Sequence, residues 1–326
     1  MNSFVKKIFA ISFSVLGISF ATLRVYAAKS SSKSASDEDL KKQILSTADL
    51  NGVSADELLA NDDADDSENQ KNQKKQTLSA QREVFYTKDL ETFYKKHFNH
   101  EIKTQEDLDF YFTQAVNSAD EFSDEYSKNV HLARCHYFYG LQLQEDFDLS
   151  AIRNLDLTDS SDTKNSNELA AEHYDEGIEL ASSAYKIKNG SDALSIWAHC
   201  ISANCTAKNV LYILGNGLKV RSYARRAVKL DYSNGTAHFL SSAQDAYAPK
   251  PFNKAVKARK EVLSYLNDDS IRMEEFDLFN MYYTVAYTYF LKKRYSQAEK
   301  WFQKALEIYP NNISANRILK NIQELK

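Results

Sequence analysis

Apolar side chains recur mostly at intervals of three or four residues along the chain after Leu78. This spacing places them on one face of an α-helix, so residues 81–326 are predicted to be helical. A polar stretch at 145–167 interrupts the pattern and predicts an exposed loop. The clearest early runs are Phe85, Leu90, Phe93, Tyr94 and Phe98, then Leu108, Tyr111, Phe112 and Ala115, then Val130, Ala133, Tyr137, Phe138 and Leu141.

The strongest pattern in the chain lies at residues 279–312, where two amphipathic helices are predicted on either side of a short turn. Pro310 ends the second helix. Small side chains let the two helix axes approach closely, and aromatic side chains fill the spaces beside them. The eight positions that carry the pattern are Tyr282, Val285, Ala286, Tyr289, Ala298, Phe302, Ala305 and Pro310.

This unit resembles a tetratricopeptide repeat, a pair of packed helices that stacks on its neighbours to form a solenoid. The fold class that follows is all-α: an irregular α-solenoid of tetratricopeptide-like helix pairs with an N-terminal helical extension. Insertions are predicted near residues 204–217 and 249–275, and a capping helix is predicted at 313–325. Two weaker echoes of the helix–turn–helix pattern run from Ala184 to Ala193 and from Ala227 to Ala237.

The resemblance also implies a binding function. The layout is loosely similar to the divergent tetratricopeptide subgroup that includes regulators of microtubule dynamics, from which no activity is carried over. Tetratricopeptide proteins commonly bind peptides in a concave groove, and Tyr283 and Tyr287 are predicted to face it because they fall outside the packing positions. An exposed surface without a partner is the alternative interpretation. A basic region is predicted to hold an acidic peptide or carboxylate, with solvated helix surface as the alternative; it consists of Lys254, Lys257, Arg259, Lys260, Lys292, Lys293 and Arg294.

The composition argues against several classes of protein. Only 8 of the 326 residues are Gly and 3 are Pro, too few for turn-rich sheets or glycine-rich phosphate loops. The motifs GxxxxGKS/T, HExxH and GxSxG do not occur. We therefore predict no catalytic residue and no cofactor, and interpret the chain as a non-enzymatic protein.

The first 27 residues have the order of an export signal. Two lysines precede an uncharged apolar run, and Ala27 and Ala28 are the small residues that signal peptidase requires. The mature chain is predicted to start at Ala28. It is predicted to reside in the periplasm or to be secreted. An uncleaved N-terminal anchor is the alternative, and only that form would attach the protein to a membrane. Residues 28–80 contain no aromatic residue and are predicted to form a disordered, polar and acidic linker.

The formal net charge of −4 conceals an uneven distribution. Residues 206–326 carry 20 basic and 11 acidic side chains, whereas residues 28–205 sum to −16. This asymmetry favours either an acidic partner for the C-terminal half or contact between the two halves, with incidental surface charge as the alternative. Nucleic acid is not an expected partner, because the chain is predicted to be exported.

Two functions remain open at this point. The leading hypothesis is an exported scaffold or adaptor that binds a protein or peptide partner, acidic in character, in its groove. The alternative is a small-ligand-binding accessory protein of a solute transporter. An open groove would favour the scaffold, and a deep enclosed pocket lined by aromatic and basic side chains would favour the accessory protein.

The three cysteines are too few for a disulfide framework. A single bridge from Cys135 to Cys200 or Cys205 is one possibility, and buried free thiols are the interpretation we favour. His131, Cys135 and His136 have side chains that suit zinc. Their apolar neighbours instead indicate a core helix, so no metal site is predicted.

Overall fold

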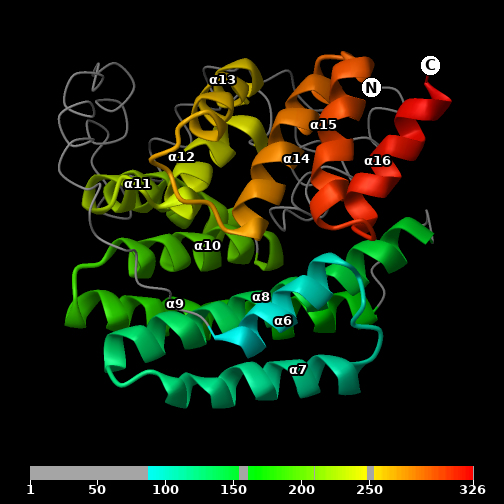
Figure 1. Ribbon diagram of the computed structural model, residues 1–326. Helices are drawn as coiled ribbons and strands as arrows, with labels where there is room; N and C mark the ends of the chain where they lie inside the picture. The colour runs from blue at the N-terminus through cyan, green and yellow to red at the C-terminus, as the bar shows by residue number, and fades with distance from the viewer. Residues whose placement is uncertain (1–86, 154–160, 209, 248–252, 326) are drawn as a thin grey trace.

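Residues 87–153, 161–208, 210–247 and 253–325 are described by the computed structural model (Figure 1). These residues form eleven α-helices and one short 3-10 helix, without a β-strand. The predicted all-α fold class is therefore confirmed. The predicted export signal and acidic linker lie outside the described residues.

Two helices form the N-terminal extension. Helix α6 (Lys88–Phe98) begins after Thr87, whose side chain accepts a hydrogen bond from a backbone amide of the first turn. Helix α7 (Gln105–Asn117) begins after Thr104, which takes part in a reciprocal capping box. A 3-10 turn at Ser118–Glu121 then leads into the main array.

The remaining helices pack in sequence order, each against the next (Figure 1). The first helix of each pair also contacts the first helix of the following pair, which connects α8 to α10, α10 to α12 and α12 to α14. This arrangement of two layers is that of a solenoid. The helices are α8 (Glu125–Arg153), α9 (Ser161–Ile187), α10 (Ser191–Ala207), α11 (Val210–Leu230), α12 (Gly235–Tyr247), α13 (Ala255–Leu266), α14 (Glu275–Leu291), α15 (Tyr295–Ile308) and α16 (Ile313–Glu324).

The structure corrects the loop predicted at 145–167. Helix α8 continues to Arg153, and α9 already begins at Ser161. The segment is polar, but it contains neither Gly nor Pro, so it lacks the residues that break a helix. The prediction of an exposed loop is wrong for the part of the segment that lies in these two helices.

The two predicted insertions are also corrected. Helix α10 ends at Ala207 and α11 begins at Val210, so the connection is short and both Gly215 and Gly217 lie inside α11. The segment 249–275 contains helix α13, which packs against α12. The described array therefore consists of four successive helix pairs, from α8 with α9 to α14 with α15.

The strongest sequence repeat corresponds to α14, the turn after it and α15. Tyr282 and Tyr289 are half-buried, and the ring of Tyr282 lies 5.7 Å from that of Trp301 between centroids. Pro310 follows the end of α15. The signature residues that are buried in the core are Val285, Ala286, Ala298, Phe302 and Ala305.

Helix α16 covers the end of the array where the capping helix was expected. Asn312 caps it by accepting a hydrogen bond from the amide of Ala315 at 3.0 Å. Ile318 and Ile322 are fully buried on its inner face, and α16 packs against α15. Within the described residues, no helix combines the length and the apolar character needed to cross a membrane.

Candidate binding surfaces

Tyr283 and Tyr287, the predicted groove contacts, lie in the core. Their side chains are 0% and 2% exposed. The ring of Tyr283 meets that of Phe302 on α15 edge-on at 5.1 Å, and Tyr287 stacks on Tyr247 of α12 at 5.2 Å. The prediction that these two residues contact a peptide is wrong for this structure, because their face of α14 packs against α12 and α15.

The predicted basic residues lie on two segments that Tyr289 joins. Arg259 of α13 and Arg294 of the α14–α15 turn both lie over the Tyr289 ring, with guanidinium carbons 4.2 and 5.3 Å from its centroid. These cation–π contacts connect the first half of α13 to the turn. We call the following residues the basic surface: Lys254, Lys257, Arg259, Lys292, Lys293 and Arg294.

The α14–α15 turn exposes three consecutive basic side chains. Lys293 has a φ of 58°, in the left-handed region. Its amide donates to the carbonyl of Phe290 at 2.9 Å, and the amide of Arg294 donates to the carbonyl of Tyr289 at 3.0 Å. These two bonds form a Schellman motif, which closes the end of α14 and directs the chain into α15.

The acidic groups nearby neutralise only part of this positive charge. The Lys257 ammonium lies 3.6 Å from the carboxylate of Asp245 and 3.9 Å from that of Glu261. Asp245 is already bound by both terminal nitrogens of the Arg221 guanidinium, at 3.2 and 3.0 Å. The ion pairs found among the described residues include none of Arg259, Lys292, Lys293 and Arg294.

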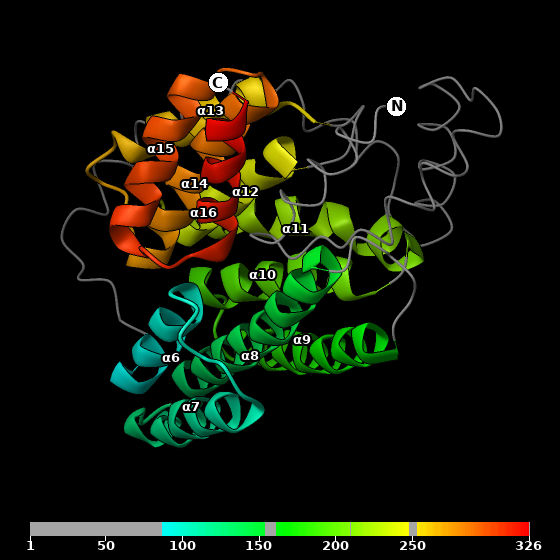
Figure 2. The same ribbon diagram turned by 90° about the vertical axis from the view of Figure 1, so that its right-hand side faces the viewer.

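Helix α6 contacts both the first and the last helix pair, which the sequence did not predict. Figure 2 shows it in the angle between α8 and the group formed by α14 and α16. Tyr94 and Phe98 lie four residues apart. Tyr94 contacts two aromatic rings of the array and Phe98 contacts three, at centroid distances of 4.9 to 6.2 Å. We call these four rings the α6-binding surface: Phe138 of α8, Phe276 and Phe279 of α14, and Tyr309 after α15.

A small cavity shares Phe138 and Phe276 with the α6-binding surface. Its volume is about 10 Å³, enough for about one water molecule. The Nε2 atom of His199 is buried without a hydrogen-bond partner in the described part of the chain. The lining fits the small-ligand alternative in character, but the volume does not admit such a ligand. Arg134, Tyr137, Phe138, Ser195, His199 and Phe276 contribute to it.

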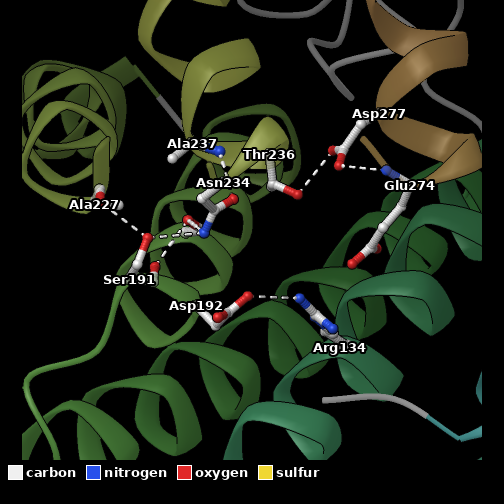
Figure 3. Close-up of polar contacts among 10 residues, drawn as sticks. Arg134, Ser191, Asp192, Ala227, Asn234, Thr236, Ala237, Glu274 and Asp277 are labelled. Atoms are coloured by element: carbon white, nitrogen blue, oxygen red, sulfur yellow. Dashed lines mark hydrogen bonds and ion pairs between the residues drawn. The ribbon is translucent and has the colours of Figure 1, made fainter. Parts of the chain in front are cut away.

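Polar side chains tie the starts of α10, α12 and α14 together (Figure 3). The side chain of Asn234 donates to two serine hydroxyls of α10, at 2.9 and 3.1 Å. Thr236 donates to the carboxylate of Asp277 at 2.8 Å. Arg134 of α8 pairs with Asp192 of α10 at 3.3 Å, and both side chains are almost fully buried. These contacts fix successive helix pairs relative to one another.

His199 is a neutral buried histidine with a testable effect on acid stability. Burial, assisted by the charge of Arg134, lowers its pKa to about 3, whereas the pKa of a histidine in an unfolded chain is about 6.5. Between these values the unfolded chain binds a proton that the folded chain does not, so the free energy of unfolding falls as the pH falls.

In the unmodified protein, proton uptake by unfolded His199 lowers the free energy of unfolding by about 1.4 kcal/mol per pH unit between about pH 6 and pH 4. We expect His199→Phe to remove this contribution to the slope. Urea denaturation at a series of pH values measures the slope for both proteins. Above about pH 7, where histidine is neutral in both states, this difference in slope should vanish. Parallel curves throughout the acid range would show that His199 takes up a proton in the folded protein.

The cysteines are free buried thiols, as favoured above, and Cys135 forms no bridge. Burial raises the pKa of each thiol. His131 donates from Nε2 to the carbonyl of Ala115 at 2.8 Å, and Nδ1 of His136 lies 3.0 Å from Nδ1 of His173. Among the described residues, no three His, Cys, Asp or Glu side chains gather as a metal site would require.

Comparison with known proteins gives one match. Residues 279–312 match the family described as tetratricopeptide repeat, over the same span that the apolar pattern predicts. A search of the curated proteins and a search of the solved structures each found no match to the chain. Residues 279–312 are thus a segment of the tetratricopeptide-repeat type, and the described helix pairs around it pack in sequence as in an all-α solenoid.

Proposed function

We propose that this protein is an exported, non-enzymatic scaffold that binds an acidic segment of a protein partner on its basic surface. Tetratricopeptide repeats commonly bind proteins or peptides, which supports an interaction role. Tyr289 carries the proposal, because it brings the basic residues of α13 and of the α14–α15 turn onto one surface. Export rests on the residue pattern at positions 1–27, and the lack of enzymatic activity rests on the absence of catalytic motifs.

The backbone at Lys293 supports a role for its charge. The left-handed position of a Schellman motif usually holds Gly, because an L side chain there costs about 1 kcal/mol. Lys293 occupies this position with a φ of 58°. A positive side chain thus occupies a position where glycine would be more stable, as is common for residues that serve function rather than stability.

Charge reversal on the turn tests this proposal. The binding of a fluorescent poly-L-glutamate peptide is measured by fluorescence anisotropy. The protein is isolated from the cell envelope or from the medium, because an exported protein is found there. We expect Lys292→Glu with Lys293→Glu to weaken binding at least about tenfold at low salt, because the peptide then meets like charge. Added salt should weaken binding to the unmodified protein, since these charges are exposed.

The matched control is Lys219→Glu with Lys320→Glu, which changes the net charge equally at exposed residues of α11 and α16. We expect this control to weaken binding far less than the pair on the turn. Equal weakening by both pairs would mean that only the overall charge matters, and no binding at all would remove the basic surface as the site.

The small-ligand accessory protein is less well supported. The cavity at His199 has the aromatic and basic lining that this function requires, but it holds about one water molecule. A scaffold needs only an accessible surface, which the basic side chains of the turn provide. We therefore place the scaffold first.

A further inference from the structure

The α6-binding surface is an aromatic patch built from opposite ends of the array. Phe138 belongs to the first helix pair, whereas Phe276 and Phe279 belong to the last. Tyr94 and Phe98 of α6 are buried against these rings. A cluster of rings of this size is seldom left open to water, and here a helix with aromatic residues four positions apart covers it.

Three polar contacts complete the recognition of α6. Nδ1 of His97 lies 2.9 Å from the side-chain oxygen of Gln142 on α8, in the interior. The ammonium of Lys95 lies 3.0 Å from the carboxylate of Glu275. The side-chain amide of Asn312 donates to the carbonyl of Phe98 at 3.3 Å, which satisfies one of the carbonyls left free at the end of the helix. The surface therefore recognises a helix by an aromatic pair, by a basic residue after the first ring and by its C-terminal end.

Helix α6 depends on its buried contacts, which include those of Leu90, Phe93, Tyr94 and Phe98, to stay in place. It has 11 residues, a length at which a helix without tertiary contacts is marginal. The side chains of Lys95 and Glu275 are 38% and 54% exposed, so their ion pair contributes little. His100, with a φ of 52°, belongs to the Schellman motif that ends α6, because its amide donates to the carbonyl of His97 and the amide of Glu101 donates to that of Lys96. The left-handed residue is therefore part of the helix end itself.

We propose that the α6-binding surface is the binding site for an amphipathic helix of a partner protein, and that α6 occupies this site in the free chain. The partner helix carries aromatic residues at positions i and i+4 and a basic residue at i+1, as Tyr94, Phe98 and Lys95 do. It displaces α6, which moves about the connection 99–104. This inference goes beyond the proposed function, because it concerns another surface and another kind of partner segment.

The test uses a fluorescent peptide with the sequence of residues 87–99, added to the full chain. In the unmodified protein α6 competes from within the same chain, so the peptide should bind weakly. Phe98→Ala in the protein weakens the internal helix and should tighten peptide binding at least about tenfold. A peptide that carries Tyr94→Ala and Phe98→Ala is the matched control and should bind neither protein.

A second variant decides the question if Phe98→Ala does not give a cooperatively folded protein. Lys95→Glu in the protein changes a partly exposed residue and places its carboxylate near those of Glu91 and Glu275. It should loosen α6 and tighten binding of the unmodified peptide at least about threefold. With Glu275→Lys in the protein, the charge at this position of the surface is reversed. A peptide carrying Lys95→Glu should then bind more tightly than the unmodified peptide.

The proposal is overturned if a folded variant binds the peptide no better than the unmodified protein does, or if the aromatic-deficient peptide binds equally well. Either result would show that α6 is a permanent part of the fold. Poly-L-glutamate binding, measured on the same variants, should stay unchanged because the basic surface is not altered. Loss of that binding alone would count against the proposed function and leave this inference standing.

Discussion

Replacing Tyr283 with alanine lowers the expected free energy of unfolding by about 3–5 kcal/mol, the range found when a buried aromatic side chain is truncated. The side chain is fully buried, and its ring lies 6.0 Å from that of Phe279 and 5.1 Å from that of Phe302. Removal of the ring leaves a cavity that its packed neighbours fill only in part. Urea denaturation followed by circular dichroism measures the change.

A residue that merely faced solvent or a peptide groove would respond differently. Lys292→Ala, in the exposed turn directly after the same helix, is expected to change the free energy of unfolding by no more than about 0.5 kcal/mol. If Tyr283→Ala also stayed within that limit, the ring would have to be accessible, and the prediction of a peptide contact would regain its support.

Replacing Gly177 with valine is the second change with a large expected effect, a destabilisation of about 3 kcal/mol. A Cβ atom at this position of α9 would lie 2.7 Å from the sulfur of Cys200 on α10 and 3.3 Å from the carbonyl oxygen of Ala133 on α8. Both neighbours belong to buried helix surfaces, so they cannot move aside without separating helices. Thermal and urea denaturation report the loss.

Gly215 provides the matched control. It lies inside α11, and apart from its chain neighbours and the backbone of its own helix, no atom of the described residues comes within 4 Å of a Cβ built there. Gly215→Ala should therefore stabilise the protein by about 0.5–1 kcal/mol, because alanine favours the helix over the unfolded chain. A destabilisation at Gly215 as large as that at Gly177 would indicate that backbone effects, rather than close packing, determine the result.

The best repeat could be predicted from the sequence because its information is local. Ala286, Ala298 and Phe302 recur at the spacing of two helices in contact, and Pro310 marks the end of the second. Helix α14 packs more extensively against its partner α15 than against any other described helix. The pattern therefore determines both the elements and the contact between them.

The surroundings of each helix could not be predicted in the same way. Spacing placed Tyr283 and Tyr287 on one face of α14, but it could not show that Phe302 and Tyr247 cover that face. For the polar segment at 145–167, the sequence did contain the relevant signal. The segment lacks Gly and Pro, so a helix can continue through its charged residues.

For the candidate binding surfaces too, local patterns could be predicted from the sequence, whereas contacts between distant segments could not. Clusters of lysine and arginine on α13 and after α14 are visible in the sequence, but their link through Tyr289 depends on the packing of two helices. For α6, the aromatic residues Tyr94 and Phe98 signal an apolar face without identifying what it meets. A single sequence carries no information on a contact between such distant segments.

The contact between Phe98 and Asn312 joins residues 214 positions apart, and this separation sets the order of folding. Neighbouring helices can pair as soon as both have left the ribosome, since closing a short loop costs less entropy than closing a long one. Helix α6 is synthesised before the rings of Phe276, Phe279 and Tyr309 that it packs against. Its docking therefore comes late, and a docked α6 indicates that synthesis has passed the last repeat.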